Sequence, residues 1–246
     1  MLASLFFAVY VVRVIYEWQE KLVGCFRPCS LEPGDGFGCG NLCRPTCRIA
    51  KSFAVRSHQY AHLFQLGDLC YHEGGNNNEN AILAEGYFKR LLAIDPNHAM
   101  ARVRYGSVLT MKARDALWPI TRLNYVKAGN REMDAAVKIA PNEAQVRFAR
   151  AVNSFHMPDI MGREEIVQED VAWLWQQAQL ADTKLNVGQK QTIALYYGQT
   201  LQKNNKLDEA LQIWQAGLDL APKSEDAAPL KEQLKKHKAP SPKGSR

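Results

Sequence analysis

The stretch Leu207–Pro222, LDEALQIWQAGLDLAP, is the part of this chain that most narrowly defines its fold. Ala210, Trp214 and Gly217 recur at a spacing that places them on one face of a helix. Pro222 then ends that helix, because proline lacks an N–H and clashes with the preceding turn. The stretch therefore predicts a helix that packs through small and aromatic residues on one face and ends at Pro222.

A second helix with a matching face is predicted just before this stretch. Its apolar face carries Ala194, Tyr197, Gly198 and Leu201. Gly198 and Ala210 are small, so two antiparallel helices can approach closely at these positions. The larger side chains then fill the space around the contact. The two helices together predict one helical hairpin.

Partial copies of this hairpin occur earlier in the chain. Ala84, Phe88 and Pro96 repeat the second helix and its stop, and Tyr105-Gly106 repeats the aromatic–glycine pair of a first helix. A further second-helix end is marked by Ala135, Ala136, Ile139 and Pro141. The stops at Pro96, Pro141 and Pro222 lie 45 and 81 residues apart. We interpret these intervals as one and two repeats with insertions.

This pattern resembles the tetratricopeptide repeat (TPR) family, whose period is about 34 residues. The resemblance implies an all-α, right-handed superhelix of stacked helical hairpins, with about four irregular repeats in residues 57–225 and an irregular N-terminal segment. It also implies an interaction scaffold whose first helices line a concave groove that binds a peptide or helix of a protein partner. The groove positions carried over are Met100, Val103, Ser107, Thr110, Gln145, Phe148, Val152, Phe155, Thr192, Leu195, Gln199 and Gln202. Because these side chains are uncharged, we expect an apolar or amide-rich ligand.

The net charge of +6 is concentrated at the C-terminal end of the chain. Residues 51–230 contain 20 Lys+Arg and 20 Asp+Glu, whereas residues 231–246 contain six basic residues and one acidic residue. A nucleic-acid-binding protein would cluster basic residues on a folded face, so we expect no nucleic-acid partner. Residues 226–246 are interpreted as a basic C-terminal tail, whose end KKHKAPSPKGSR (235–246) is solvated and disordered, with a weak contact to an anionic membrane or nucleic acid as the alternative.

Residues 1–20 begin with the apolar run Met1–Tyr16, which only Arg13 interrupts. A membrane-spanning helix needs about 20 predominantly apolar residues. We interpret the segment as a membrane anchor or uncleaved signal, with a cleaved export signal, a buried helix or an incorrectly assigned start as alternatives. The expected location is membrane-associated or exported, with a cytoplasmic location as the alternative.

Residues 21–56 are rich in glycine, proline and cysteine. Five of the six cysteines fall here, at Cys25, Cys29, Cys39, Cys43 and Cys47. Three interpretations stay open: a zinc or iron–sulfur site, a disulfide cluster in an oxidising compartment, or no site at all. A second group (His58, His62, Cys70 and His72) is interpreted as ordinary polar residues on an opening helix.

Two functional hypotheses follow. The first is a membrane-tethered TPR scaffold, and the second is a metal-binding or redox accessory protein that uses Cys25–Cys47. The chain contains no glycine-rich phosphate loop, nucleophile elbow or metalloprotease motif, so we expect neither an enzyme nor a bound cofactor. The acidic pairs Glu164-Glu165 and Glu169-Asp170 are interpreted as solvated helix faces. Self-association through the exposed ends of the array is left open.

Overall fold

The computed structural model describes residues 60–73 and 78–237, and the regular structure in these ranges is entirely helical. Contacts divide the chain into two units, Met1–Lys51 and Ser52–Arg246. The first unit lies outside the described residues, and so do the apolar run, the five clustered cysteines and His58.

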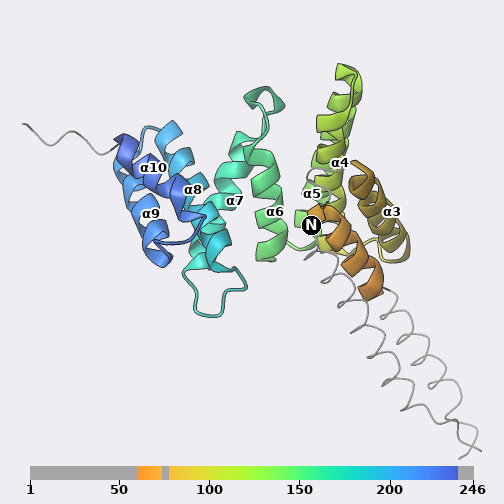
Figure 1. Cartoon of the computed structure of the whole chain (residues 1–246), viewed down its shortest axis with the longest axis horizontal. Helices are drawn as coiled ribbons and strands as arrows, with labels where there is room; N and C mark the ends of the chain where they lie inside the picture. Colours follow the sequence, from red (N-terminus) through yellow and green to blue (C-terminus); the bar gives the residue numbers. More distant parts are fainter. Residues whose placement is uncertain (1–59, 74–77, 238–246) are drawn as a thin grey trace, which may run out of the picture. The chain divides into compact units, whose positions relative to one another are not determined.

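The second unit is a succession of short helices joined by tight turns. Residues 60–73 form the first described helix. It is followed by α3 (Asn78–Ile94), α4 (Ala99–Asp115), α5 (Pro119–Ile139), α6 (Ala144–Phe155), the 3-10 turn η1 (Asp159–Met161), α7 (Glu164–Ala178), α8 (Val187–Lys203), α9 (Leu207–Leu220) and α10 (Ala227–His237) (Figure 1).

The helices pack as consecutive hairpins. α4 packs on α5, α6 on α7, and α8 on α9, while α4 contacts α6, α6 contacts α8, and α8 contacts α10. The first helices of successive hairpins are therefore neighbours. At the N-terminal side, Phe64 of the 60–73 helix meets Phe88 of α3, with ring centroids 6.1 Å apart. The prediction of an all-α array of helical hairpins is confirmed for the described residues.

The repeat is longer than the expected period. The first helices α4, α6, α8 and the final helix α10 begin at residues 99, 144, 187 and 227, so successive starts are 45, 43 and 40 residues apart. Between Pro96 and Pro141 the extra residues extend α4 to 17 residues and α5 to 21 residues. Trp118 is the N-cap of α5 and Pro119 its first residue, a position that tolerates proline because its N–H has no partner inside the helix.

The three predicted stops occupy equivalent positions. Pro96, Pro141 and Pro222 are exposed and each lies two residues beyond the last residue of α3, α5 or α9. Two of their carbonyl groups accept a hydrogen bond from an arginine six residues later, Arg102 on Pro96 and Arg147 on Pro141. These arginines tie the start of a first helix to the turn before it.

Close approach of α8 and α9 depends on a glycine. A Cβ at Gly198 would collide with the indole of Trp214, and Trp214 is itself fully buried. Its Nε1 donates a hydrogen bond to the carbonyl oxygen of Leu195 at 3.1 Å. Ala194, Ala210 and Leu201 complete this cluster. In the α4–α5 hairpin, Gly106 has the same role, because a Cβ there would lie 2.7 Å from the carbonyl oxygen of Gly129.

The C-terminal end corrects one prediction. Residues 227–237, interpreted from the sequence as part of a basic tail whose end is disordered, form α10. Leu230 is fully buried and Leu234 is 9% exposed, and both pack on the cluster around Trp214. Ala227, Leu230 and Leu234 share a helical face that the surrounding lysines conceal in the sequence. The helix covers the apolar edge of the last hairpin, as end helices of repeat arrays do.

Candidate functional site

An open apolar groove lies where the α4–α5 hairpin meets the end of α6 and the turn that follows it. It has a volume of about 730 Å³. We call it the hairpin groove. Its apolar lining comes from three elements and the connection after α6: Ala113, Pro119, Leu123, Val126, Val152, Met157, Pro158 and Met161. Tyr71 of the 60–73 helix completes it on the N-terminal side.

The groove exists because neighbouring helices differ in length. α5 has 21 residues, whereas α6 has 12, so α5 is longer by about 13 Å at a rise of about 1.5 Å per residue. The lining residues of α5 are in its first two turns, and those of α6 are in its last turn. The first half of α5 therefore packs on α4 but extends past the end of α6. In Figure 1 the α4–α5 turn and η1 lie on the same side of the array.

Large exposed apolar side chains neighbour the lining residues of the groove in the sequence. Trp118 and Ile120, 72% and 65% exposed, flank the lining residue Pro119, and Leu117, 88% exposed, precedes them. In η1, Ile160 is 92% exposed and lies between the lining residues Pro158 and Met161. Clusters of exposed apolar side chains mark interaction sites in soluble proteins.

The polar residues of the groove include no carboxylate. Arg114, Arg122 and His156 line it together with Thr110 and Asn153. The Nε of Arg122 donates to the carbonyl oxygen of Ala116 at 2.6 Å, and Arg114 pairs with Asp115 at 2.9 Å. Thr110 and Asn153 bond to each other at 2.9 Å across α4 and α6. The groove thus has an apolar floor and a basic edge.

An aromatic cluster fixes the end of α6 that borders the groove. The rings of Phe155 and Tyr196 stack with centroids 3.9 Å apart. The Tyr196 hydroxyl lies 2.8 Å from the Nε2 of His156. Burial raises the pKa of Tyr196 above its ordinary value. Tyr196 of α8 thereby holds His156, a lining residue of the hairpin groove, in place.

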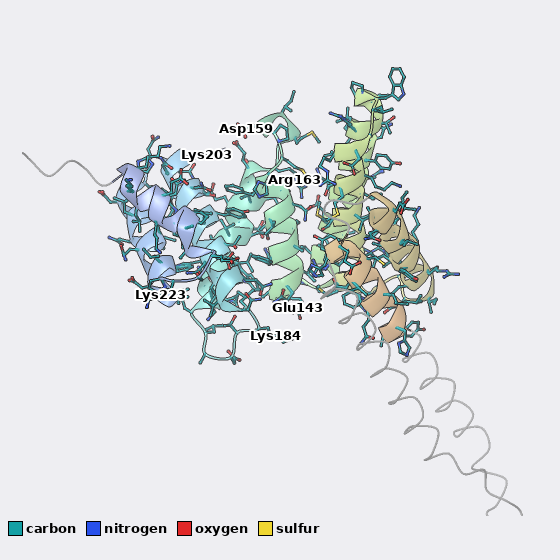
Figure 2. The ribbon with its side chains drawn as sticks, in the orientation of Figure 1. Glu143, Asp159, Arg163, Lys184, Lys203 and Lys223 are labelled. Atoms are coloured by element: carbon teal, nitrogen blue, oxygen red, sulfur yellow. The ribbon has the colours of Figure 1, made fainter. Side chains whose placement is uncertain are left out.

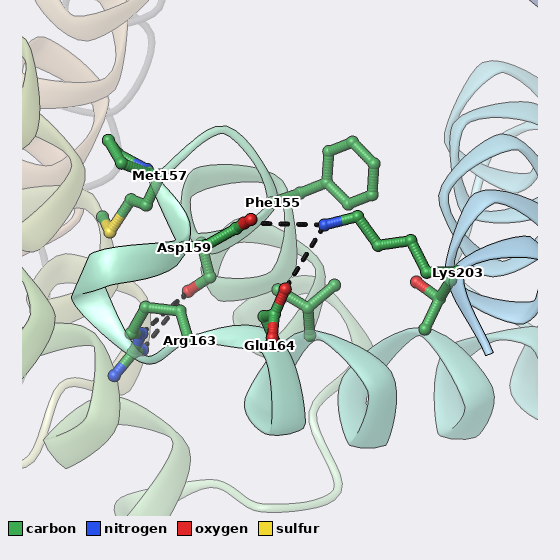
Figure 3. Close-up of a pocket in the computed structure, with 10 residues that line it drawn as sticks. Phe155, Met157, Asp159, Arg163, Glu164 and Lys203 are labelled. Carbon is green, nitrogen blue, oxygen red and sulfur yellow. Dashed lines mark hydrogen bonds and ion pairs between the residues drawn. The ribbon is translucent and has the colours of Figure 1, made fainter.

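A smaller cavity of about 170 Å³ lies on the other side of the α6–α7 connection (Figure 3). The ammonium group of Lys203 is 3.5 Å from Asp159 and 3.4 Å from Glu164. Arg163, whose side chain is turned to Asp134 at 2.7 Å, also borders it. Because its cations and carboxylates already pair with one another, this cavity offers no free charge to a ligand.

Buried ion pairs connect the hairpins beneath these surfaces, and one of their residues contradicts a prediction from the sequence. Asp170, interpreted from the sequence as part of a solvated face, is fully buried. Both of its carboxylate oxygens accept hydrogen bonds from Arg150, at 2.7 and 2.8 Å, and Arg147 donates to it at 2.8 Å. Glu169 beside it is exposed, as expected. The charge at residue 170 is accommodated because α6 supplies two arginines, a pairing that no local sequence signal shows.

Asp134 of α5 extends this network. It accepts hydrogen bonds from Arg163, which precedes α7, and from Arg150 of α6. Burial acts to raise the pKa of Asp134, but the hydrogen bonds and charges of Arg163 and then Arg150 outweigh it, so the pKa is lowered. The network therefore links α5, α6 and α7 through charged groups.

The groove positions that the family resemblance implied lie in different surroundings in the structure. Val103 and Ser107 are fully buried, so these two assignments are corrected: Val103 packs on Met133 and Val146, and the Ser107 hydroxyl bonds to Asn153 at 2.9 Å. Of the twelve positions, Thr110 and Val152 line the hairpin groove. Sequence spacing cannot separate residues that line a groove from residues that point toward a preceding or following hairpin, because both lie on the same helices.

The remaining positions are half-buried on the first helices. Gln145 and Gln189 hydrogen-bond to each other through their side-chain amides, and Glu143 and Lys184 pair nearby at 3.7 Å (Figure 2). The Thr192 hydroxyl donates to Gly188, and Gln202 contacts His237 of α10 at 3.0 Å. The others are Met100, Phe148, Phe155, Leu195 and Gln199.

The predicted metal and disulfide chemistry is left untested. Cys25, Cys29, Cys39, Cys43 and Cys47 lie outside the described residues. Among the residues that are described, no group of three or more His, Cys, Asp or Glu side chains is arranged to hold a metal ion. His62 is exposed, and His72 lies 3.5 Å from Asp68. In the same part of the chain, no helix is both long and apolar enough to cross a membrane.

Comparison with known proteins gives a fold likeness only. No family model matches this sequence, and no curated protein matches it. Solved structures similar to this chain include a thermophilic TPR protein from Thermus thermophilus. The two are 16% identical, with a TM-score of 0.47, over 77% of this chain and 95% of that chain.

Proposed function

We propose that this chain is a protein-interaction scaffold that holds an apolar peptide or helix of a protein partner in the hairpin groove. The observation that carries the proposal is the groove itself, with its apolar floor, its volume of about 730 Å³ and the exposed apolar side chains next to its lining residues. Grooves and pockets of this kind, with few polar groups, are the usual form of a binding site.

Trp118 supplies a further argument. An exposed tryptophan beside a groove is the residue type that most often dominates the energy of a protein interface. Its side chain is 72% exposed, and it follows a turn that Arg122 ties down by its bond to the Ala116 carbonyl oxygen. A side chain placed on such a fixed turn loses little freedom when a partner covers it.

The site differs from the concave surface that the family resemblance implied. Side chains at several of those positions, such as Gln145 and Gln202, are bonded to neighbouring helices. A ligand there would have to break existing hydrogen bonds, whereas Leu123 and Val126 offer half-buried apolar surface in an open groove. The proposed partner segment is therefore apolar rather than amide-rich.

Site-specific photo-crosslinking in cells tests this proposal. A photoreactive phenylalanine at position 126 faces the groove, and the same residue at the exposed position 138 of α5 is the matched control. We expect one protein partner to crosslink from position 126 and not from position 138, and we expect Leu123→Glu to abolish that product. Equal products from both positions, or none from either, would refute a groove-binding scaffold.

We also propose that residues 1–20 tether the scaffold to a membrane. The support is the apolar run Met1–Tyr16, which Arg13 alone interrupts. Fractionation of the full chain and of a variant lacking residues 1–20 tests it. Membrane recovery of the full chain only is expected, and recovery of both in the soluble fraction would contradict tethering.

A further inference from the structure

We infer that the partner segment of the hairpin groove is an amphipathic helix with carboxylates beside its apolar face. The inference rests on the proposed function and adds the chemistry of the partner. Two features of the groove carry it: the excess of cations along its edge, and the exposed apolar side chains that neighbour its lining residues in the sequence.

Arg122 is the centre of the charge argument. Its side chain lies on the groove and is exposed, and its Nε donates to the Ala116 carbonyl oxygen, which holds the guanidinium in place. Within the described residues, no carboxylate lies at ion-pair distance from it. A guanidinium fixed in this way presents its remaining N–H groups as a fork, which matches the two oxygens of a carboxylate.

The other charges around the groove do not cancel this one. Arg114 already pairs with Asp115, so that pair is neutral. Asp159, the first residue of η1, and Glu164, the first residue of α7, share Lys203 on the far side of the α6–α7 connection. A ligand in the groove therefore meets a positive field, and a carboxylate is the group that it stabilises.

The shape of the groove favours a helix as the occupant. Its walls are helices and a turn, and no sheet edge occurs among the described residues to which an extended strand could bond. A helix binds such a groove by inserting side chains at positions i, i+3, i+4 and i+7. Leu123 and Val126 can receive these side chains, while Trp118 and Ile160 offer further apolar surface next to the lining residues Pro119, Pro158 and Met161.

A lipid surface is the competing occupant, since exposed Trp, Leu and Ile side chains beside arginines also suit a membrane interface. A bilayer would reach the protruding Leu117, Trp118 and Ile160, which are the most exposed. It would not follow the concave surface down to the half-buried Leu123 and Val126. The apolar floor therefore favours the helix.

Designed peptides test the inference directly. The probe is a fluorescein-labelled amphipathic helix of about 18 residues, roughly five turns, with leucines on one face and glutamates beside them. The matched peptide has lysine in place of glutamate. Binding to the full chain is followed by fluorescence anisotropy. We expect the glutamate peptide to bind about five- to tenfold more tightly, the range for one or two exposed ion pairs, and this preference to fall as salt is added.

Three variants locate the effect. Arg122→Glu is expected to reverse the preference between the two peptides. Arg131→Glu, on the same helix but outside the groove, is the control and should leave it unchanged. Val126→Glu should weaken both peptides by removing apolar contact. Circular dichroism of each variant verifies that the helices are retained.

Each other outcome overturns the inference. Equal binding of the two peptides, or no effect of Arg122→Glu, would exclude an acidic helix and leave the scaffold proposal standing. Binding of phosphatidylserine vesicles that Trp118→Ala abolishes, with no binding of either peptide, would assign this face to lipid. Failure of the scaffold proposal would appear instead in the crosslinking, as a loss of the difference between positions 126 and 138.

Discussion

The last hairpin and the central hairpins are built on different chemistry. α8 and α9 close around Trp214, which is fully buried among alanines and leucines against Gly198. α5, α6 and α7 meet around Asp170, which is equally buried but held by Arg147 and Arg150. Both contacts join the same kinds of helices in one array.

Sequence patterns are informative about one of these contacts and not about the other. Apolar contacts leave a trace in the sequence, because small and large residues must recur at helical spacing. A buried ion pair leaves none, because an aspartate far along the chain from its arginine resembles a solvated residue. Asp170 and Arg150 belong to separate helices, and only the folded structure brings their charged groups together. Four predictions test this contrast.

The largest effect is expected at the buried carboxylate. Asp170→Ala leaves Arg150 and Arg147 without their shared partner in a water-poor environment, so the free energy of unfolding should fall by about 3–5 kcal/mol. Glu169→Ala, one residue earlier and exposed, is the control and should change it by less than about 0.5 kcal/mol. Urea denaturation measures both. Similar values for the two variants would contradict a structural role for the buried pair.

The apolar centre should be less sensitive to a conservative change. Trp214→Phe removes the indole hydrogen bond to Leu195 and leaves a small cavity, for an expected loss of about 2 kcal/mol. Trp118→Phe, at an exposed indole, should lie within about 0.5 kcal/mol of the unmodified protein. Thermal unfolding followed by circular dichroism compares them, and a larger loss at residue 118 would reverse the assignment of core and surface.

The connections of the two regions differ as well. The α6–α7 connection has Gly162 at φ +62°, and the α8–α9 turn has Asn205 at φ +61°. Gly162→Ala should cost about 1 kcal/mol, because a Cβ is disfavoured in this conformation even though the space around it is open. Asn205→Gly should change stability by less than about 0.5 kcal/mol, since asparagine and glycine both tolerate a positive φ. Chemical denaturation measures the free energy of unfolding of both variants, and an unchanged value for Gly162→Ala would contradict the prediction.

The smallest effect is expected from acid. Because the pKa of Asp134 is lowered in the folded chain, its contribution is present above the unfolded pKa, which is about 3.9, and is lost as pH falls through the folded value. Asp134→Asn should therefore flatten the decline of stability below about pH 4. Unfolding free energies measured from about pH 5 to about pH 2 test this, and an unchanged slope would show that other carboxylates dominate.

The hairpins can be predicted from their packing residues in the sequence. Gly198 and Trp214 identify the last hairpin, and Pro96, Pro141 and Pro222 mark real helix ends. The helix α10 cannot be predicted in this way, because the three lysines around its two buried leucines make the segment resemble a solvated tail. Helix faces that are short and flanked by charge give too few apolar positions to establish a period.

The hairpin groove is largely hidden in the sequence for a different reason. Thr110 and Val152 are expected to line a ligand site, but Leu123, Val126 and Trp118 are not. The groove results from the difference in length between α5 and α6, and such a difference is apparent only when the helices are placed side by side. One signal could have found it: the run Leu117-Trp118-Pro119-Ile120 puts large apolar residues at a turn, where polar residues are expected.

The helix α10 also has a consequence for the order in which the array is completed during synthesis. A ribosome releases α8 and α9 before α10, and a chain elongates at about 5–20 residues per second. Until Leu230 and Leu234 emerge, the cluster around Trp214 is open to water along one edge. The last hairpin should therefore reach full stability only seconds after its own helices are made, which leaves an interval in which chaperones can bind it.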